Sequence, residues 1–208
     1  MDQEQSSIEK VVSLFKRLPG IGEKSAQRFV YFYLNAPKEE GLRLADAIKR
    51  MLLETKTCSI CYNKTDLDPC KICTDDSRDK FQICVVETPL DVQLIEDTKL
   101  HRGKYFVLGG VIDPTNGVGP DELLIDELTD LLKKLSVDKK QIEIIFAFAP
   151  SLQSEVTINY VIKKISSSGV VNIKFSKLAQ GLQTGSDLQY TDTSTLGRAL
   201  VGRVEVGK

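Results

Sequence analysis

The stretch Cys58-Ser-Ile-Cys61-Tyr-Asn-Lys-Thr-Asp-Leu-Asp-Pro-Cys70-Lys-Ile-Cys73 decides how the middle of this chain folds. Two Cys-x2-Cys pairs bring four thiolates around one point, the tetrahedral environment that Zn²⁺ prefers. Between the pairs, Asp66, Asp68 and Pro69 are turn-forming residues that let one pair fold back on the other. The spacing therefore predicts one structural zinc ion per chain, with no position open for a substrate. Its ligands would be Cys58, Cys61, Cys70 and Cys73.

Two disulfides, or four unrelated thiols, are the alternatives to a zinc site. Residues 1–5 are polar and acidic, without the apolar segment of a secretory signal. We therefore expect a cytoplasmic protein, in which cysteines at this spacing bind metal rather than form disulfides. The fifth cysteine, Cys84, lies in an apolar run and is expected to be a small core residue.

Composition is that of an ordinary globular protein. The chain has 208 residues, of which 41% are hydrophobic, and a formal net charge of −1, so it can form one medium domain or several small ones. No apolar run is long enough to span a bilayer, and we expect no membrane partner. The near-neutral charge counts against nucleic acid as a partner, although a local basic patch or several copies of a weak site can compensate.

The first 54 residues read as three helices. Apolar residues at helical spacing predict one helix from residue 8 to residue 18, a second after Gly22, and a third over 42–52. Gly20 and Gly22 let the backbone approach another molecule, and free N–H groups at the next helix start suit a phosphate. Lys24 and Arg28 share one face beyond this hairpin. A tight hairpin with solvated basic residues is the alternative.

From residue 81 onward, short apolar runs alternate with helical patterns. This alternation predicts a mostly parallel sheet covered by helices on both faces, with ligands at the carboxyl ends of the strands. Glu87 and the glycine-rich loop 109–119 belong to that edge. The predicted strands are 81–86, 105–108, 142–148 and 170–175, and the predicted helices are 89–96, 122–135, 155–165 and 195–200.

Two parts of the chain resemble known motifs. Leu18-Pro-Gly-Ile-Gly followed by Lys24-Ser-Ala resembles the helix-hairpin-helix motif, and the alternating strands and helices resemble a Rossmann-like Toprim domain. Together with the cysteine quartet, Ile83-Cys-Val-Val-Glu-Thr-Pro and Thr195-Leu-Gly-Arg-Ala-Leu, this order resembles the RecR family of bacterial recombination mediators over essentially the whole chain. The resemblance implies an α/β multidomain protein: a helix-hairpin-helix region at 1–54, a C4 zinc finger at 55–79, a Toprim domain at 80–176 and a C-terminal oligomerisation region at 177–208.

The resemblance also implies a function. RecR proteins are similar in being non-enzymatic, DNA-binding tetrameric rings in DNA repair, acting with RecO and RecF to place RecA on gapped or single-stranded DNA. It implies bacterial cytoplasm, at the nucleoid, as the location. The resemblance implies that the four cysteines bind zinc. It also implies that DNA is contacted by Lys24, Arg28, Gly20 and Gly22.

This chain departs from the family pattern in two places. After the third strand, relatives read Asn-Pro-Thr and then Glu-Gly-Glu-Ala-Thr, whereas Ala149, Gln153 and Ser154 stand here and only Glu155 keeps its acid. The resemblance implies a RecO contact through Glu87 and Glu155, weakened by these changes. The usual His-Gly-x-Pro-x-Gly-Gly has become residues 180–186, without its histidine and proline.

An enzyme is the competing interpretation: a Toprim-type Mg²⁺-dependent nuclease or primase-like protein using Glu87 and Asp113. Catalytic Toprim sites add an Asp-x-Asp after the third strand, and here Ala149-Pro-Ser supplies no carboxylate. Mg²⁺ is then hard to hold, so we expect no catalytic residue. A third possibility is a scaffold whose hairpin and zinc finger serve only protein contacts.

Overall fold

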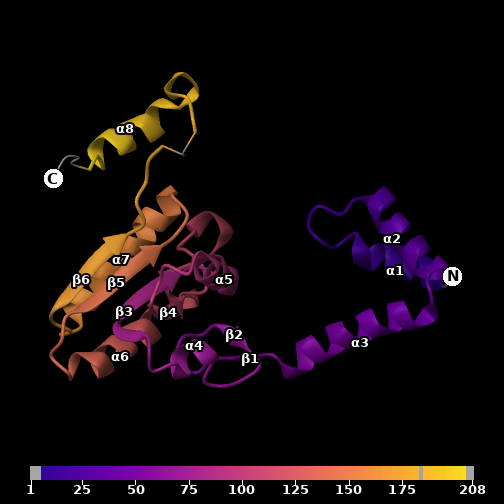
Figure 1. The fold of residues 1–208 in the computed structure, drawn as a ribbon, viewed down its shortest axis with the longest axis horizontal. Coiled ribbons are helices and arrows are strands. Elements are labelled where there is room, and N and C mark those ends of the chain that lie inside the picture. The colour runs from indigo at the N-terminus through magenta and orange to yellow at the C-terminus, as the bar shows by residue number, and fades with distance from the viewer. Residues whose placement is uncertain (1–5, 183–184, 205–208) are drawn as a thin grey trace. The chain divides into compact units, whose positions relative to one another are not determined.

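The structure is a computed structural model that describes residues 6–182 and 185–204. The chain divides into two compact units, Met1–Thr55 and Lys56–Lys208. The first is helical, and the second contains a parallel sheet with helices around it (Figure 1). This combination confirms the predicted α/β multidomain fold.

The first unit consists of α1 (Ser7–Phe15), α2 (Glu23–Asn35) and α3 (Lys38–Glu54). A capping box fixes the start of α1: the Glu9 N–H donates to Ser6 Oγ, and the Ser6 N–H donates to the Glu9 carboxylate. The helix ends at Phe15 rather than at Leu18, because the following N–H groups bond three residues back and tighten the last turn. Its core is small and comprises Val12, Ala26 and Val30.

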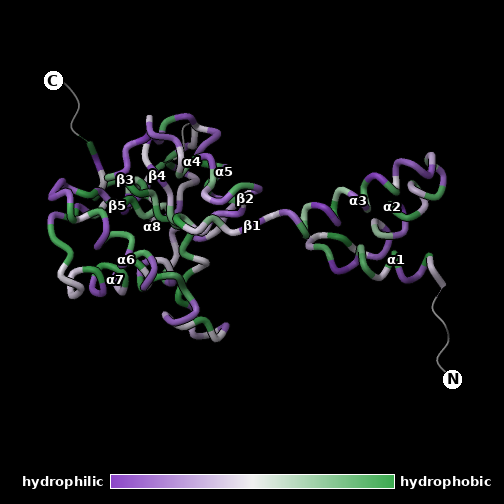
Figure 2. The backbone as a smooth tube through the Cα atoms, turned by 90° about the horizontal axis from the view of Figure 1, so that it is seen from below, coloured by the Kyte–Doolittle hydropathy of each residue, from purple (hydrophilic) through white to green (hydrophobic). Residues whose placement is uncertain are grey.

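Helix α3 has no fully buried residue. Hydrophobic and hydrophilic stretches alternate along it (Figure 2). Leu42, Ile48 and Leu52, which form the predicted apolar face, are 68%, 46% and 72% exposed. A helix with such a face normally buries it, and the first unit by itself leaves this face of α3 only partly covered.

The second unit is built on a four-stranded, fully parallel sheet in the order β4-β3-β5-β6. A two-stranded antiparallel sheet precedes it. Chain order reverses between β3 and β5, so their carboxyl ends form the switch point at which such sheets bind ligands. The strands are β1 (Lys56–Thr57), β2 (Lys64–Thr65), β3 (Asp79–Val86), β4 (Gly103–Val107), β5 (Ile142–Ala147) and β6 (Ile173–Lys177).

Helices cover one face of the sheet completely and the other only in part. On the first face, Val85, Phe106 and Ile144 pack with residues of α6 (Ile125–Ser136) and α7 (Leu152–Ser167). On the second, α5 (Pro89–Thr98) and the short α4 (Lys71–Thr74) cover β3 and β4. Beyond them, Glu143 on β5 meets Lys174 and Ser176 on β6. Helices thus lie on both faces, as predicted, and the second face is polar where it extends over β5 and β6.

Element ends differ from the predictions by a few residues, each for a local reason. Strand β6 begins at Ile173 rather than at residue 170, because Asn172 adopts a left-handed φ of 63°. Helix α7 begins at Leu152, where the Ser151 hydroxyl caps it. Helix α6 begins at Ile125, because Pro120–Glu122 forms a separate 3-10 turn, and α8 (Thr193–Val201) begins after the Asp192 cap.

Candidate metal centre and nucleic-acid interface

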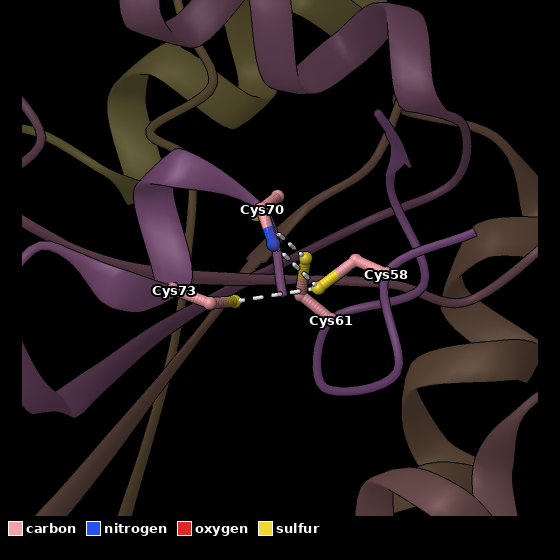
Figure 3. A group of neighbouring side chains, drawn as sticks. All are labelled: Cys58, Cys61, Cys70 and Cys73. Atoms are coloured by element: carbon pink, nitrogen blue, oxygen red, sulfur yellow. Dashed lines mark hydrogen bonds between the residues drawn. The ribbon is translucent and has the colours of Figure 1, made fainter. Parts of the chain in front are cut away.

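The four cysteines come together as the spacing predicted. Their sulfur atoms all lie within 4.8 Å of one another, and the side chains converge from a loop and the start of α4 (Figure 3). Cys58 Sγ lies 3.9 Å from Cys73 Sγ, and Cys61 Sγ lies 3.6 Å from Cys70 Sγ. A tetrahedron with Zn–S bonds of about 2.3 Å has edges of about 3.8 Å. The arrangement therefore fits one tetrahedral ion.

The cysteines are unsuited to the alternatives. All of them are free, and their sulfurs stand well beyond the disulfide bond length of about 2.05 Å. Cys58, Cys61 and Cys70 are buried, and the Cys70 N–H donates to Cys58 Sγ at 3.3 Å, a contact that favours a thiolate. The fifth, Cys84, is 2% exposed within the sheet core, as predicted.

Three of the cysteine thiols differ in how readily they ionise. Cys73 as hydrogen-bond donor lowers the pKa of Cys61 to about 6. Burial raises the pKa of Cys70 to about 11, and the hydrogen bond with Cys61 raises that of Cys73. Without a metal, ionisation is therefore favoured at Cys61 and opposed at Cys70 and Cys73, whereas a bound metal ion would favour the thiolate form of its ligands.

Contacts around the cysteines hold the two pairs in place. The Asp68 carboxylate accepts a 2.7 Å hydrogen bond from the Ser59 N–H, which ties the second pair to the first. The Cys61 carbonyl accepts from the Val107 N–H at 2.8 Å, joining the cluster to β4. Lys104 Nζ donates to the carbonyls of Ile72, Cys73 and Asp75, at the end of α4. Sequence reasoning did not find Lys104.

The hairpin between α1 and α2 leaves its glycines open. Gly20 adopts a φ of +76°, and a Cβ built on Gly20 or Gly22 would meet nothing within 4 Å. Gly22 begins α2 without a side-chain cap. The partly buried Ile21 packs against the core of this unit and fixes the turn between the two glycines. A ligand can therefore approach the backbone at the start of α2.

Lys24 and Arg28 lie exposed on α2, and neither forms a hydrogen bond or ion pair with another of the described residues. Their charges are free for an anion. The first residue of α2 opposes this arrangement, since the Glu23 carboxylate stands at the helix start. Lys16 pairs with Glu23 and offsets part of its charge.

At the carboxyl edge of the large sheet, Glu87 and Asp113 are each held by hydrogen bonds within the protein. Glu87 accepts a 2.9 Å hydrogen bond from the Ala149 N–H. Asp113 is engaged within its own loop by Thr115 and Asn116. Within the ranges 6–182 and 185–204, the cysteine quartet is the only group of three or more potential metal ligands.

Glu155 on α7 is already paired. Lys177 Nζ, at the end of β6, lies 2.7 Å from its carboxylate. Thr157 on the same helix is fully buried, and its hydroxyl accepts from the Ile112 N–H at 2.8 Å. This contact holds the loop after β4 against α7.

His101, to which the sequence assigned no role, belongs to a structural network. Its ring meets Tyr105 edge-on at 4.8 Å, and the Tyr105 hydroxyl donates to Glu96 at 2.7 Å. Arg78 forms a bidentate pair with Glu96. Burial opposes ionisation of Glu96, but the hydrogen bonds from Arg78 and Tyr105 outweigh it and lower the Glu96 pKa. The network runs from Arg78 to Tyr105, over 28 residues of sequence, so no local motif could reveal it.

Comparison with known proteins agrees with this geometry. Residues 8–52 match the family model of the RecR helix-hairpin-helix region, 82–175 that of a Toprim domain, and 184–204 that of the RecR C-terminal region. The chain is 45% identical to the recombination protein RecR of Bifidobacterium longum subsp. infantis, over 96% of both chains. This chain belongs to the RecR family.

Other RecR proteins show the same degree of similarity. The chain is 45% identical to that of Herpetosiphon aurantiacus, covering 96% of this chain and 94% of the relative. It is 43% identical to that of Cutibacterium acnes, over 96% of both. The resemblance seen in the sequence is thereby confirmed.

No helix among the described residues is both long and apolar enough to cross a membrane.

Proposed function

We propose that this chain is a non-enzymatic, DNA-binding recombination mediator in DNA repair. In this proposal it acts with RecO and RecF to promote loading of RecA on gapped or single-stranded DNA, in the bacterial cytoplasm at the nucleoid. The observation that carries the proposal is the open hairpin beside two unpaired cations, in a chain that matches RecR proteins along almost its whole length. The chain would then consist of four parts, which end at residues 54, 79, 176 and 208.

DNA is bound through its backbone in this scheme. N–H groups at Gly20 and Gly22 and the charges of Lys24 and Arg28 would contact phosphates, which fixes position without reading sequence. Such binding releases counterions and weakens as salt rises. We therefore expect affinity to fall steeply with salt and to depend little on base sequence.

The cysteine quartet would hold one structural Zn²⁺. All four ligands come from the protein, and sulfur ligands with this geometry select Zn²⁺ over the hard cations. The ion would fix Cys58 and Cys61 against Cys70 and Cys73 and so shape the region between the hairpin and the large sheet in sequence. No chemical step is assigned to it.

Self-association into a ring explains the exposed apolar groups. Leu14, Leu34 and Ile48 help to line an apolar groove of about 720 Å³ in the first unit. Leu188 and Tyr190 in the C-terminal region are 58% and 88% exposed. A homotetramer would bury such groups and present four hairpins to one DNA, raising avidity without making any subunit basic.

For the partner RecO, Glu87 and Glu155 are the proposed contacts. Glu87 is partly exposed, whereas Glu155 must first give up its ion pair with Lys177. An exposed ion pair of this kind is worth only about 0–1 kcal/mol, so a basic partner could replace Lys177. Residues 180–182 and 185–186 of the altered loop are described, and 183–184 lie outside the described residues.

Incubation with labelled gapped DNA and Mg²⁺ tests whether the protein cuts or extends DNA strands. We expect a shifted band on a native gel and intact strands on a denaturing gel. Cut or extended strands would favour the alternative Toprim nuclease or primase-like enzyme, for which the edge around Glu87 and Asp113 offers little support.

Charge reversal tests the DNA site itself. Lys24→Glu with Arg28→Glu should abolish binding at moderate salt, whereas Lys38→Glu with Arg43→Glu on α3 serves as the matched control. Binding by Lys24→Glu with Arg28→Glu that is as strong as that of the control and of the unaltered protein would favour the scaffold interpretation.

A further inference from the structure

We propose that Tyr31 and Phe32 form a stacking platform for unpaired bases, so that the face of α2 that binds phosphates also selects single-stranded over duplex DNA. This inference rests on the proposed function, because it needs DNA to lie along α2. It adds a residue role and a substrate preference that the hairpin alone does not supply.

The platform continues the line of the two cations. Lys24, Arg28, Tyr31 and Asn35 follow one another at spacings of four, three and four, which places them on one face of α2. The buried residues of the helix, Ala26 and Val30, lie on the opposite side. A strand whose phosphates meet Lys24 and Arg28 would therefore bring its bases toward Tyr31.

The rings are accessible and are held in a polar setting. Tyr31 is 56% and Phe32 is 55% exposed. Both line a hollow of about 490 Å³, together with Arg28, Asn35 and Ala36. The Phe32 ring packs edge-on against Tyr33 at 5.1 Å, which restrains its orientation. The hollow thus combines two aromatic rings, a guanidinium group and an amide.

This combination fits a nucleobase better than a protein surface. Bases stack on aromatic rings whatever their identity, arginine adds a cation–π contribution, and an amide can bond a base edge. The apolar groove of about 720 Å³, by contrast, is lined almost entirely by apolar side chains, which is typical of the buried core of a homo-oligomer interface. In duplex DNA the faces of the bases are covered by their neighbours, so only unpaired bases can use the platform.

Binding of labelled oligodeoxythymidylate and of a blunt duplex of equal length tests the proposal on the full chain. Loss of base stacking predicts that Tyr31→Ala with Phe32→Ala weakens single-strand binding about tenfold or more. Duplex binding should change less than about twofold. Tyr160→Ala, a partly exposed tyrosine on α7, is the matched control.

A fluorescence measurement reports stacking directly. The chain contains no tryptophan, so Tyr31→Trp introduces a single indole. Its emission should be quenched by oligodeoxythymidylate at saturation and be nearly unchanged by saturating duplex. Equal quenching by both DNAs would contradict selection of unpaired bases.

The same experiments separate this proposal from the one on which it rests. If Lys24→Glu with Arg28→Glu abolishes binding while the alanine pair has no effect, stacking is wrong and the DNA site stands. If neither double variant matters, both fail. If the alanine pair changes the mass measured by light scattering and weakens both DNAs equally, the rings instead serve contact between copies, and the proposal is overturned.

Discussion

The carboxylate of Glu87 accepts a 2.9 Å hydrogen bond from the backbone N–H of Ala149, linking the carboxyl ends of β3 and β5 at the point where strand order reverses. A metal-dependent Toprim site would need a second carboxylate here, and this chain has a methyl side chain and a backbone donor instead. At the switch point, Glu87 is therefore hydrogen-bonded to the main chain that follows the neighbouring strand.

Glu87→Ala should therefore leave DNA chemically intact, as in the unaltered protein, and lower the free energy of unfolding by about 1–2 kcal/mol through loss of one charged hydrogen bond. Denaturant unfolding and denaturing gels measure the two effects. Mg²⁺-dependent cutting that vanished in the variant would show a live catalytic site.

Cys58→Ser should lower bound zinc and stability together, because metal binding at such a site is part of the folding free energy. Metal analysis and thermal unfolding are the measurements. Cys84→Ala, which alters a thiol outside the cluster, should keep its zinc. A Cys58→Ser protein that was metal-free yet equally stable would exclude a structural role.

Lys104→Met should weaken zinc retention about tenfold, because Lys104 Nζ binds three carbonyls at the end of α4 and supports Cys73 from outside the ligand shell. Competition with a chromogenic chelator gives the affinity. Lys80→Met, which removes an exposed ion pair with Asp138 and a cation–π contact with Phe81, both away from the cysteines, is the control. Identical zinc affinities in the two variants would show that Lys104 does not support the site.

Glu23→Gln should strengthen DNA binding about two- to fivefold, because a carboxylate at the start of α2 repels phosphate and occupies the favourable end of the helix dipole. Titration at low and high salt measures the gain, which should shrink as salt rises. Glu39→Gln in the first turn of α3 controls for the change in net charge. Weaker binding by Glu23→Gln would mean that DNA does not approach this helix start.

The Glu96 network should make stability depend on acid pH. Burial opposes ionisation of Glu96, yet Arg78 and Tyr105 lower its pKa below the ordinary 4.5. A carboxyl group whose pKa is lower in the folded state stabilises the fold at every pH above its unfolded-state pKa. This stabilisation is lost as the pH falls through the lower, folded-state pKa. The difference in unfolding free energy between the unaltered protein and Glu96→Gln should therefore hold from pH 7 to about 5 and shrink below pH 4.5. A constant difference across that range would count against an ionised Glu96.

Sequence by itself determined the features that depend on local spacing. The spacing of two Cys-x2-Cys pairs predicts that they converge on one point, and the alternation of apolar runs with helical patterns predicts a parallel sheet. The hairpin could also be predicted from the sequence, because its glycines, Lys24 and Arg28 are close together in the chain. Element ends were less certain, because caps such as Ser151 and the left-handed Asn172 decide them.

Tertiary structure alone decided the contacts between residues distant in the chain. Lys104 reaches carbonyls about 30 residues earlier, Glu87 meets Ala149 across two strands, and Arg78 pairs with Glu96. No periodicity encodes such pairs, because they follow from which strands lie side by side and how helices pack on them. The sequence predicted an apolar face on α3 and helices over both faces of the sheet. Only the structure showed that the residues of this α3 face are largely exposed.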